Sequence, residues 1–201
     1  MSNKIFSFPL LCQRLYLCEV KFMSTTNNDE VKLLIANSFR KILEVKPVSK
    51  ITVVDIMNAS GMTRQMFYHY FQDIDGLAFW IHMQETWKYS ERFYEEEDFI
   101  HAYSDCLEKM KQNRSFYRNI SKKDGPNSFS SLFFQNMIEN ANRYIGKKRM
   151  SDEVSFALDL YWKGTTAQMV SWIQDGMKIP PHILAERFYM CLPPILRAFY
   201  E

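Results

Sequence analysis

The sequence predicts an all-α fold, in which a small three-helix domain precedes a larger helical domain. Apolar residues recur at steps of three and four over most of the chain, which is the spacing of one α-helix face. Short stretches with Gly or Pro separate these segments and would end each helix. With 201 residues, 47% of them hydrophobic, the chain can bury a small core and a larger one. We expect domains at residues 23–72 and 73–201, after an extension at residues 1–22.

The extension at residues 1–22 contains a short apolar run that could be mistaken for a targeting signal. Gln13 and Arg14 end this run early, and no small-residue cleavage pattern follows it. Met23 then opens a polar segment that is typical of a protein start. We therefore expect Met23 to be the native start and residues 1–22 to be disordered.

Composition excludes several classes of protein. The net charge is only +2, so non-specific coating of nucleic acid is not indicated. The sequence has no C-x-x-C pair and no pair of histidines near the cysteines, so a zinc site is not expected. The cysteines are scattered, so no disulfide framework is expected either. The four cysteines are Cys12, Cys18, Cys106 and Cys191. No segment approaches the roughly 20 apolar residues that cross a bilayer. A cytoplasmic protein without metal, cofactor or membrane partner is expected.

Catalytic motifs are also missing from the sequence. It contains no nucleophile elbow, no HExxH pair and no phosphate-binding loop. The histidines lie in unrelated settings, at His69, His82, His101 and His182. We expect no catalytic residues and no enzyme activity.

The first predicted helix spans residues 28–45. Its apolar positions follow helical spacing, and Pro47 breaks the chain after it. These positions are Val31, Leu34, Ile35, Ser38, Phe39 and Ile42. This helix would support the two that follow.

Residues 51–71 predict two short helices around a tight turn. Thr52 can cap the first helix, over residues 52–59, and Gly61 tolerates the left-handed conformation that turns the chain sharply. Thr63 can cap the second helix. There Phe67 and Phe71 lie four residues apart and can pack inward. The outward side chains are then Arg64, Gln65, Tyr68 and His69. This surface suits a DNA major groove, because Arg can pair with guanine and Gln with adenine.

The same stretch resembles the helix-turn-helix of TetR-type regulators. The family pattern falls on Thr52, Ile56, Gly61, Thr63, Phe67, Tyr68 and Phe71. The resemblance implies phosphate contacts from Thr52, Thr63, Tyr68 and Tyr70, and base contacts from Arg64, Gln65 and Met66. His69 joins this predicted DNA-binding set. One position departs from the family, because Ile74 stands where a phosphate-binding Lys is usual. The alternative interpretation is an aromatic core with an ordinary corner at Gly61.

Predicted helices of the second domain span residues 74–88, 99–110, 115–120, 129–144, 152–174 and 181–200. Residues 122–126 form a loop, the acidic run at residues 95–98 reads as a solvated cap, and residues 146–149 read as a basic helix end. Pro193 and Pro194 interrupt the last helix and would kink it.

The helix at residues 152–174 carries an apolar stripe, and Gly164 would permit close approach of another helix. TetR-type proteins form dimers through their last two long helices, so the resemblance implies a homodimer interface on this stripe. The predicted interface residues are Leu158, Tyr161, Thr165, Met169 and Trp172. Residues 161–188 further resemble the C-terminal domain of a subgroup that includes an activator of dihydroxyacetone kinase genes.

The second domain is also rich in aromatic residues and methionines, which can line a ligand pocket or simply fill a core. The candidate pocket residues are Trp87, Tyr103, Phe116, Phe133, Tyr161, Trp162 and Met169. The sequence as a whole predicts a homodimeric regulator, a repressor or an activator, that binds a double-stranded DNA operator and responds to a small molecule or a protein coactivator. The alternative is an adaptor with a degenerate DNA-binding domain that docks a protein coactivator.

Overall fold

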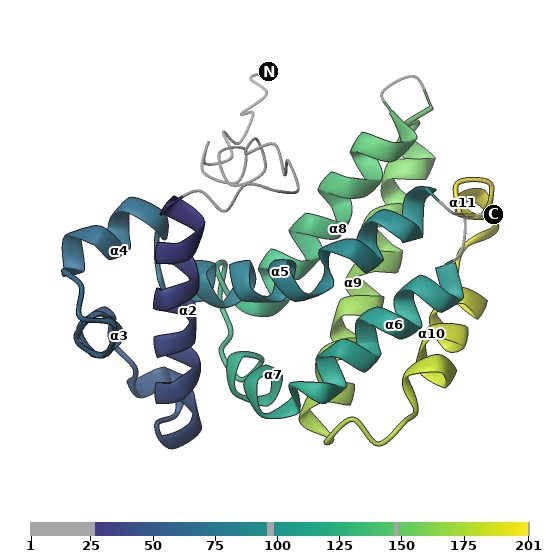
Figure 1. Cartoon of the computed structure of the whole chain (residues 1–201). Helices are drawn as coiled ribbons and strands as arrows, with labels where there is room; N and C mark the ends of the chain where they lie inside the picture. The colour runs from purple at the N-terminus through teal and green to yellow at the C-terminus, as the bar shows by residue number, and fades with distance from the viewer. Residues whose placement is uncertain (1–26, 96–98, 147–148, 201) are drawn as a thin grey trace.

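A computed structural model of the chain describes residues 27–95, 99–146 and 149–200. All regular structure within these residues is helical, as predicted (Figure 1). The helices are α2 (Asn27–Val45), η1 (Val48–Lys50), α3 (Val53–Ser60), α4 (Arg64–Tyr70), α5 (Ile74–Glu95), α6 (Phe99–Gln112), α7 (Arg114–Ile120), α8 (Phe129–Ile145), α9 (Asp152–Gln174), α10 (Pro181–Met190) and α11 (Pro194–Arg197). The predicted extension at residues 1–22 lies outside the described residues.

Helices α2, α3 and α4 form an N-terminal module at one end of the molecule (Figure 1). The apolar face of α2 supplies Ile35 and Phe39, which are fully buried. Ile56 of α3 and Phe67 of α4 are buried in the same hydrophobic cluster. A long helix thus supports the two short ones, because neither could bury its apolar face alone.

Helix α5 leads from this module into a helical body made of α5 to α11 (Figure 1). Phe71, at the end of α4, meets Trp80 of α5 with ring centroids 5.7 Å apart. Leu77 and Ile81 continue the buried face of α5. In the body, α5 packs against α6 and α8, α8 pairs with α9, and α10 packs against α6. The module and the body therefore share one continuous hydrophobic cluster.

The end of the chain differs from the predicted kinked helix over residues 181–200. Helix α10 ends at Met190, and a separate short helix, α11, begins at Pro194. Pro193 is the N-cap of α11 and Pro194 is its first residue, where the missing N–H leaves no hydrogen bond unmade. The two prolines thus start a new helix.

Two predicted charged segments lie partly outside the described residues. Glu96, Glu97 and Asp98 of the acidic run and Lys147 and Lys148 of the basic helix end are among these positions. Helix α5 continues to Glu95, seven residues past the predicted end at residue 88. Within the part of the chain that the structure describes, no helix combines the length and apolar character needed to cross a membrane.

Candidate nucleic-acid interface

The start of α3 is fixed by a capping box around Thr52. The backbone N–H of Asp55 donates to Oγ1 of Thr52 at 3.2 Å, and the backbone N–H of Thr52 donates to Oδ2 of Asp55 at 2.8 Å. Lys46 also donates to Asp55 Oδ2, at 2.6 Å. This Lys46 hydrogen bond, followed by those from Thr52, lowers the pKa of Asp55 to about 2. The Thr52 hydroxyl donates to the same carboxylate at 2.8 Å, so it is already engaged in the free protein.

The turn between α3 and α4 depends on Gly61. This residue has φ 70° and ψ 22°, the left-handed conformation that suits glycine. The N–H of Met62 then bonds to the carbonyl of Met57 at 3.0 Å, which closes the end of α3. Thr63 caps α4 by accepting from the N–H of Met66. The predicted corner and both predicted caps are confirmed.

Helix α4 has one buried face and one open face. Phe67 has no exposed surface, and its ring lies 5.7 Å from the ring of Phe71. The exposed side chains are Arg64, Gln65, Met66, Tyr68 and His69. The structure therefore leaves these five predicted DNA-binding residues accessible on one short helix, as a groove-reading helix requires.

Tyr70, also predicted to contact phosphate, is oriented differently. Its side chain is half-buried, and its hydroxyl donates to Oδ1 of Asn28 at 3.2 Å, which ties the end of α4 to the start of α2. Any phosphate contact from this hydroxyl would have to compete with Asn28.

Arg64 and Tyr68, one turn apart on α4, contact each other on the exposed face. Nη2 of Arg64 donates to the Tyr68 hydroxyl at 3.2 Å, and the guanidinium carbon lies 5.5 Å from the ring centroid. Such an exposed contact is worth only about 0.5–1 kcal/mol. The contact with Tyr68 therefore restrains the Arg64 side chain only weakly.

Ile74 occupies the first position of α5, where TetR-type proteins usually have Lys, and it packs against the core cluster. The carboxylates beside it are held by the loop between α7 and α8. Lys123 pairs with Asp75, and Asn127 donates to Oδ2 of Asp73 at 2.9 Å. Burial raises the pKa of Asp75, against the effect of Lys123. The start of α5 is therefore tethered to the α7–α8 loop, and position 74 offers no ammonium group that could bind phosphate.

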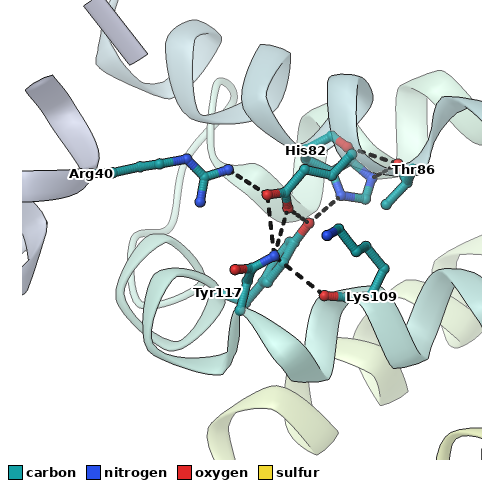
Figure 2. Close-up of polar contacts among 7 residues, drawn as sticks. Arg40, His82, Thr86, Lys109 and Tyr117 are labelled. Atoms are coloured by element: carbon teal, nitrogen blue, oxygen red, sulfur yellow. Dashed lines mark hydrogen bonds and ion pairs between the residues drawn. The ribbon is translucent and has the colours of Figure 1, made fainter. Parts of the chain in front are cut away.

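A second polar cluster, which the sequence does not predict, joins the module to the body (Figure 2). Arg40 of α2 donates from Nη2 to Oε1 of Glu85 on α5 at 2.5 Å, and its guanidinium lies 4.8 Å from the ring centroid of Phe116 on α7. Asn113 donates to both oxygens of Glu85, at 3.1 and 3.2 Å. No sequence signal marks this cluster, because its members are up to 73 positions apart in the chain.

The candidate pocket residues are packed within the body. Trp87 is half-buried, and the other six are buried. Tyr161 donates its hydroxyl to the carbonyl of Phe188 at 2.9 Å, and Tyr103 lies against Trp162 and Phe188. These contacts describe a well-packed core, and the ligand pocket stays a prediction.

The residues predicted for the dimer interface on α9 face the interior of the protomer. Leu158, Tyr161, Thr165, Met169 and Trp172 are all buried within the protomer. Their burial leaves little surface for a second copy, and Tyr161 already donates to the carbonyl of Phe188 on α10. The apolar side chains that α9 exposes are Phe156 and Leu160, with 71% and 62% of their surface accessible. Helical spacing located the apolar stripe, but it could not tell an intramolecular neighbour from an intermolecular one.

Comparisons with known proteins agree with this geometry. Residues 97–193 match the family of transcriptional regulator C-terminal regions, TetR_C_8. The HTH-type dhaKLM operon transcriptional activator DhaS of Lactococcus lactis subsp. lactis (strain IL1403) is 26% identical over 102 residues, which cover 49% of this chain and 53% of that protein. The chain thus matches about half the length of this curated relative.

Solved structures resemble the chain over most of its length. The dihydroxyacetone kinase operon activator DhaS is similar with a TM-score of 0.53 and 21% identity, over 84% of this chain and 97% of that one. The TetR family repressor AlkX from Dietzia sp. strain DQ12-45-1b and NalD, the secondary repressor of the MexAB-OprM multidrug efflux pump in Pseudomonas aeruginosa, each have a TM-score of 0.51 and 17% identity, over 85% of this chain and 97% of theirs.

The chain therefore shares the fold of these solved structures, with a capped helix-turn-helix in its N-terminal module. Within this architecture, residues 97–193 of the body are the part that matches the family of transcriptional regulator C-terminal regions.

Proposed function

We propose that this protein is a homodimeric, cytoplasmic transcription regulator that binds a double-stranded DNA operator through α4. The observation that carries the proposal is the division of α4 into a buried face at Phe67 and an exposed face with Arg64 and Gln65. Arginine and glutamine can each form bidentate hydrogen bonds with base edges in the major groove. Residues 23–72 would form the DNA-binding domain and residues 73–201 the domain for effector binding and dimerisation.

The remaining polar side chains around α4 would hold the DNA backbone. Thr63 and Tyr68 are exposed beside the base-reading positions, and Thr52 caps the helix that precedes them. We assign these three hydroxyl groups and Tyr70 to phosphate contacts, and Met66 and His69 to the groove surface. Phosphate contacts set position and affinity, whereas base contacts set sequence choice.

Dimerisation would use the exposed face of α9. Phe156, Leu160, Gly164, Ala167 and Ser171 follow one another at steps of three and four and are all exposed. The first two supply apolar surface, and the small residues that follow let a second helix approach closely. A Cβ added at Gly164 would meet no atom within 4 Å in the protomer. A two-fold axis would bring this face against its own copy and space two α4 helices for half-sites about 34 Å apart.

The body would sense the signal that controls DNA binding. The similar proteins include one activator and two repressors, so both directions of control occur on this fold. We propose a repressor or an activator whose DNA affinity changes with a small molecule or a protein partner bound to the body. No cofactor is required for this function.

The adaptor alternative is favoured by the start of α5. Ile74 is packed against the core, and the neighbouring Asp73 and Asp75 bring negative charge to the helix end that usually holds phosphate. In this alternative, the module has lost DNA binding and the body docks a protein coactivator.

Footprinting of the purified protein on the DNA upstream of its own gene tests the proposal. A regulator should protect two half-sites related by a two-fold axis, and its affinity should fall steeply with salt. A gel-shift series on genomic fragments without any salt-sensitive shift would instead support the adaptor.

A further inference from the structure

The polar cluster between the module and the body extends to a buried histidine (Figure 2). The hydroxyl of Tyr117 on α7 lies 3.4 Å from Oε2 of Glu85 and 3.0 Å from Nδ1 of His82, both on α5. Since Arg40 of α2 donates to the other oxygen of Glu85, the contacts run unbroken from α2 to His82. The chain of groups therefore links a helix of the module to the interior of the body.

Tyr117 and His82, which lie within hydrogen-bonding distance of each other, are both neutral. His82 is only 2% exposed and is surrounded by the rings of Phe79, Phe129 and Phe133 at 5.3–5.7 Å. Burial lowers the pKa of His82 to about 3, so its ring carries one N–H at neutral pH. Burial also raises the pKa of Tyr117 far above its usual value, so the phenol keeps its proton. The direction of the hydrogen bond between Tyr117 and His82 therefore depends on which ring nitrogen of His82 carries the proton.

Two arrangements of these protons fit the distances. In the first, Tyr117 donates to Nδ1 of His82, and the opposite N–H at Nε2 points to Oγ1 of Thr86 at 3.5 Å. Thr86 donates its own proton to the carbonyl of His82 at 2.8 Å, so every donor has an acceptor. In the second, Nδ1–H donates to Tyr117, which donates to Glu85. Nε2 then loses its partner, because Thr86 has already used its only proton.

Arg40 decides between these arrangements, because it controls how many donors Glu85 still needs. With Arg40 and Asn113 in place, the carboxylate is well supplied, and the first arrangement leaves no buried polar group unsatisfied. Without Arg40, the carboxylate keeps only the amide of Asn113 and attracts the Tyr117 hydroxyl. The gain of a charge-assisted hydrogen bond then outweighs the loss at Nε2.

We propose that the Tyr117 hydroxyl is a two-position donor, which points to His82 when Arg40 holds Glu85 and to Glu85 when Arg40 withdraws. On withdrawal the hydroxyl rotates and keeps its proton, while His82 loses the proton at Nε2 and gains one at Nδ1 by exchange with solvent. The number of protons is unchanged. The histidine tautomer thus reports the position of α2 to the centre of the body.

The regulatory meaning of this device depends on the proposed function, because α2 supports the helices that would bind DNA. Coupling between two sites is reciprocal. A change in the body that favours Nδ1–H would therefore weaken the hold of Arg40 on α5 and loosen the module. The hydrogen-bond device itself does not depend on DNA binding and is tested without DNA.

The test is a two-bond ¹H–¹⁵N correlation spectrum of the full-length ¹⁵N-labelled protein near pH 7.5, which distinguishes histidine tautomers. With four histidines in the chain, the signal of His82 is assigned by its loss in His82→Asn. Wild type should show Nε2–H at His82. Arg40→Met, which removes the guanidinium but keeps an unbranched side chain, should move most of the population to Nδ1–H. Lys41→Met is the matched control, because it removes an exposed charge from the next position of α2.

Two further variants make the test decisive. Glu85→Gln removes the charge that attracts the hydroxyl, so Arg40→Met combined with Glu85→Gln should stay in the Nε2–H form. In a Tyr117→Phe background, Arg40→Met should have no effect on His82. An unchanged spectrum in Arg40→Met, or a change that persists in either double variant, overturns the proposal. If Arg40→Met does not fold, Glu85→Gln and Arg40→Lys are compared with wild type. All three proteins should show Nε2–H at His82. Nδ1–H in wild type or in either variant overturns the proposal.

Discussion

The open faces of α4 and α9 are chemically opposite, although both lie on helices whose other face is buried. Helix α4 exposes Arg64 and Gln65, which offer hydrogen-bond donors and one positive charge. Helix α9 exposes Phe156 and Leu160, followed by small residues. Hydrogen-bonding groups in a fixed array can discriminate between base edges, whereas apolar surface gains most when a protein surface excludes water from it. The two faces therefore suit two different partners, DNA and a second copy of the chain.

The largest effect should come from charge placed on the α9 face. Replacement of Phe156 and Leu160 by Glu removes apolar burial worth about 1.5–3 kcal/mol for each side chain and places like charges together at a two-fold axis. We expect a folded monomer in light scattering and the loss of cooperative operator binding. Gln168→Glu adds the same charge to an exposed position beside the stripe and should leave the dimer intact. A dimer that survives the double replacement would locate the interface elsewhere.

Replacements on the α4 face should change sequence choice while the dimer stays intact. Arg64→Ala and Gln65→Ala would each remove one of the proposed bidentate base contacts, and such a contact is worth roughly 1–3 kcal/mol of discrimination. Binding titrations against operators with single base-pair changes should show that discrimination is lost at one base pair per half-site for each variant. Equal weakening on every sequence would mean that neither side chain reads a base.

Gly164→Ala should separate protomer stability from dimer stability. In the protomer the added methyl group meets open space, and alanine stabilises a helix interior by about 1 kcal/mol relative to glycine. Thermal unfolding of the dissociated protomer should therefore occur at a higher temperature. The dimer should dissociate more readily, because the methyl group would crowd the partner helix. Ser155→Ala changes an exposed position of α9 outside the stripe and is the control for dimerisation. Tighter dimerisation of Gly164→Ala would contradict a close helix crossing at this position.

The two faces also differ in how well the sequence predicted them. The caps at Thr52 and Thr63 and the left-handed Gly61 are local features, set by residues within three or four positions of one another. For this reason the orientation of Arg64 and Gln65 could be predicted. On α9 two faces carry apolar residues, one with Leu158 and Met169 and one with Phe156 and Leu160. Which of them is buried in the protomer depends on how the other helices of the body pack against α9. Leu158 and Met169, which the sequence placed in the dimer interface, are buried inside the protomer for this reason.

The contact between Arg40 and Glu85 was even less predictable from the sequence than the buried face of α9. Each residue looks like an ordinary charged position on an amphipathic helix, and 45 positions separate them in the chain. Only tertiary packing brings them together with Asn113. The departure from the family pattern at Ile74 marks the start of α5, which the α7–α8 loop holds, and it gave no indication of the contact between Arg40 and Glu85.

The smallest effect is expected for Tyr68→Phe, which removes one hydroxyl from the open face of α4. If this hydroxyl holds a phosphate, binding should weaken by about 1 kcal/mol, roughly fivefold, on all sequences alike. Because Arg64 donates to the same hydroxyl in the free protein, the competing role is to position Arg64 for its base. Titrations of Tyr68→Phe, Arg64→Ala and the double variant distinguish the two roles. Additive losses support the phosphate contact, whereas a hydroxyl that matters only when Arg64 is present would assign Tyr68 to sequence choice.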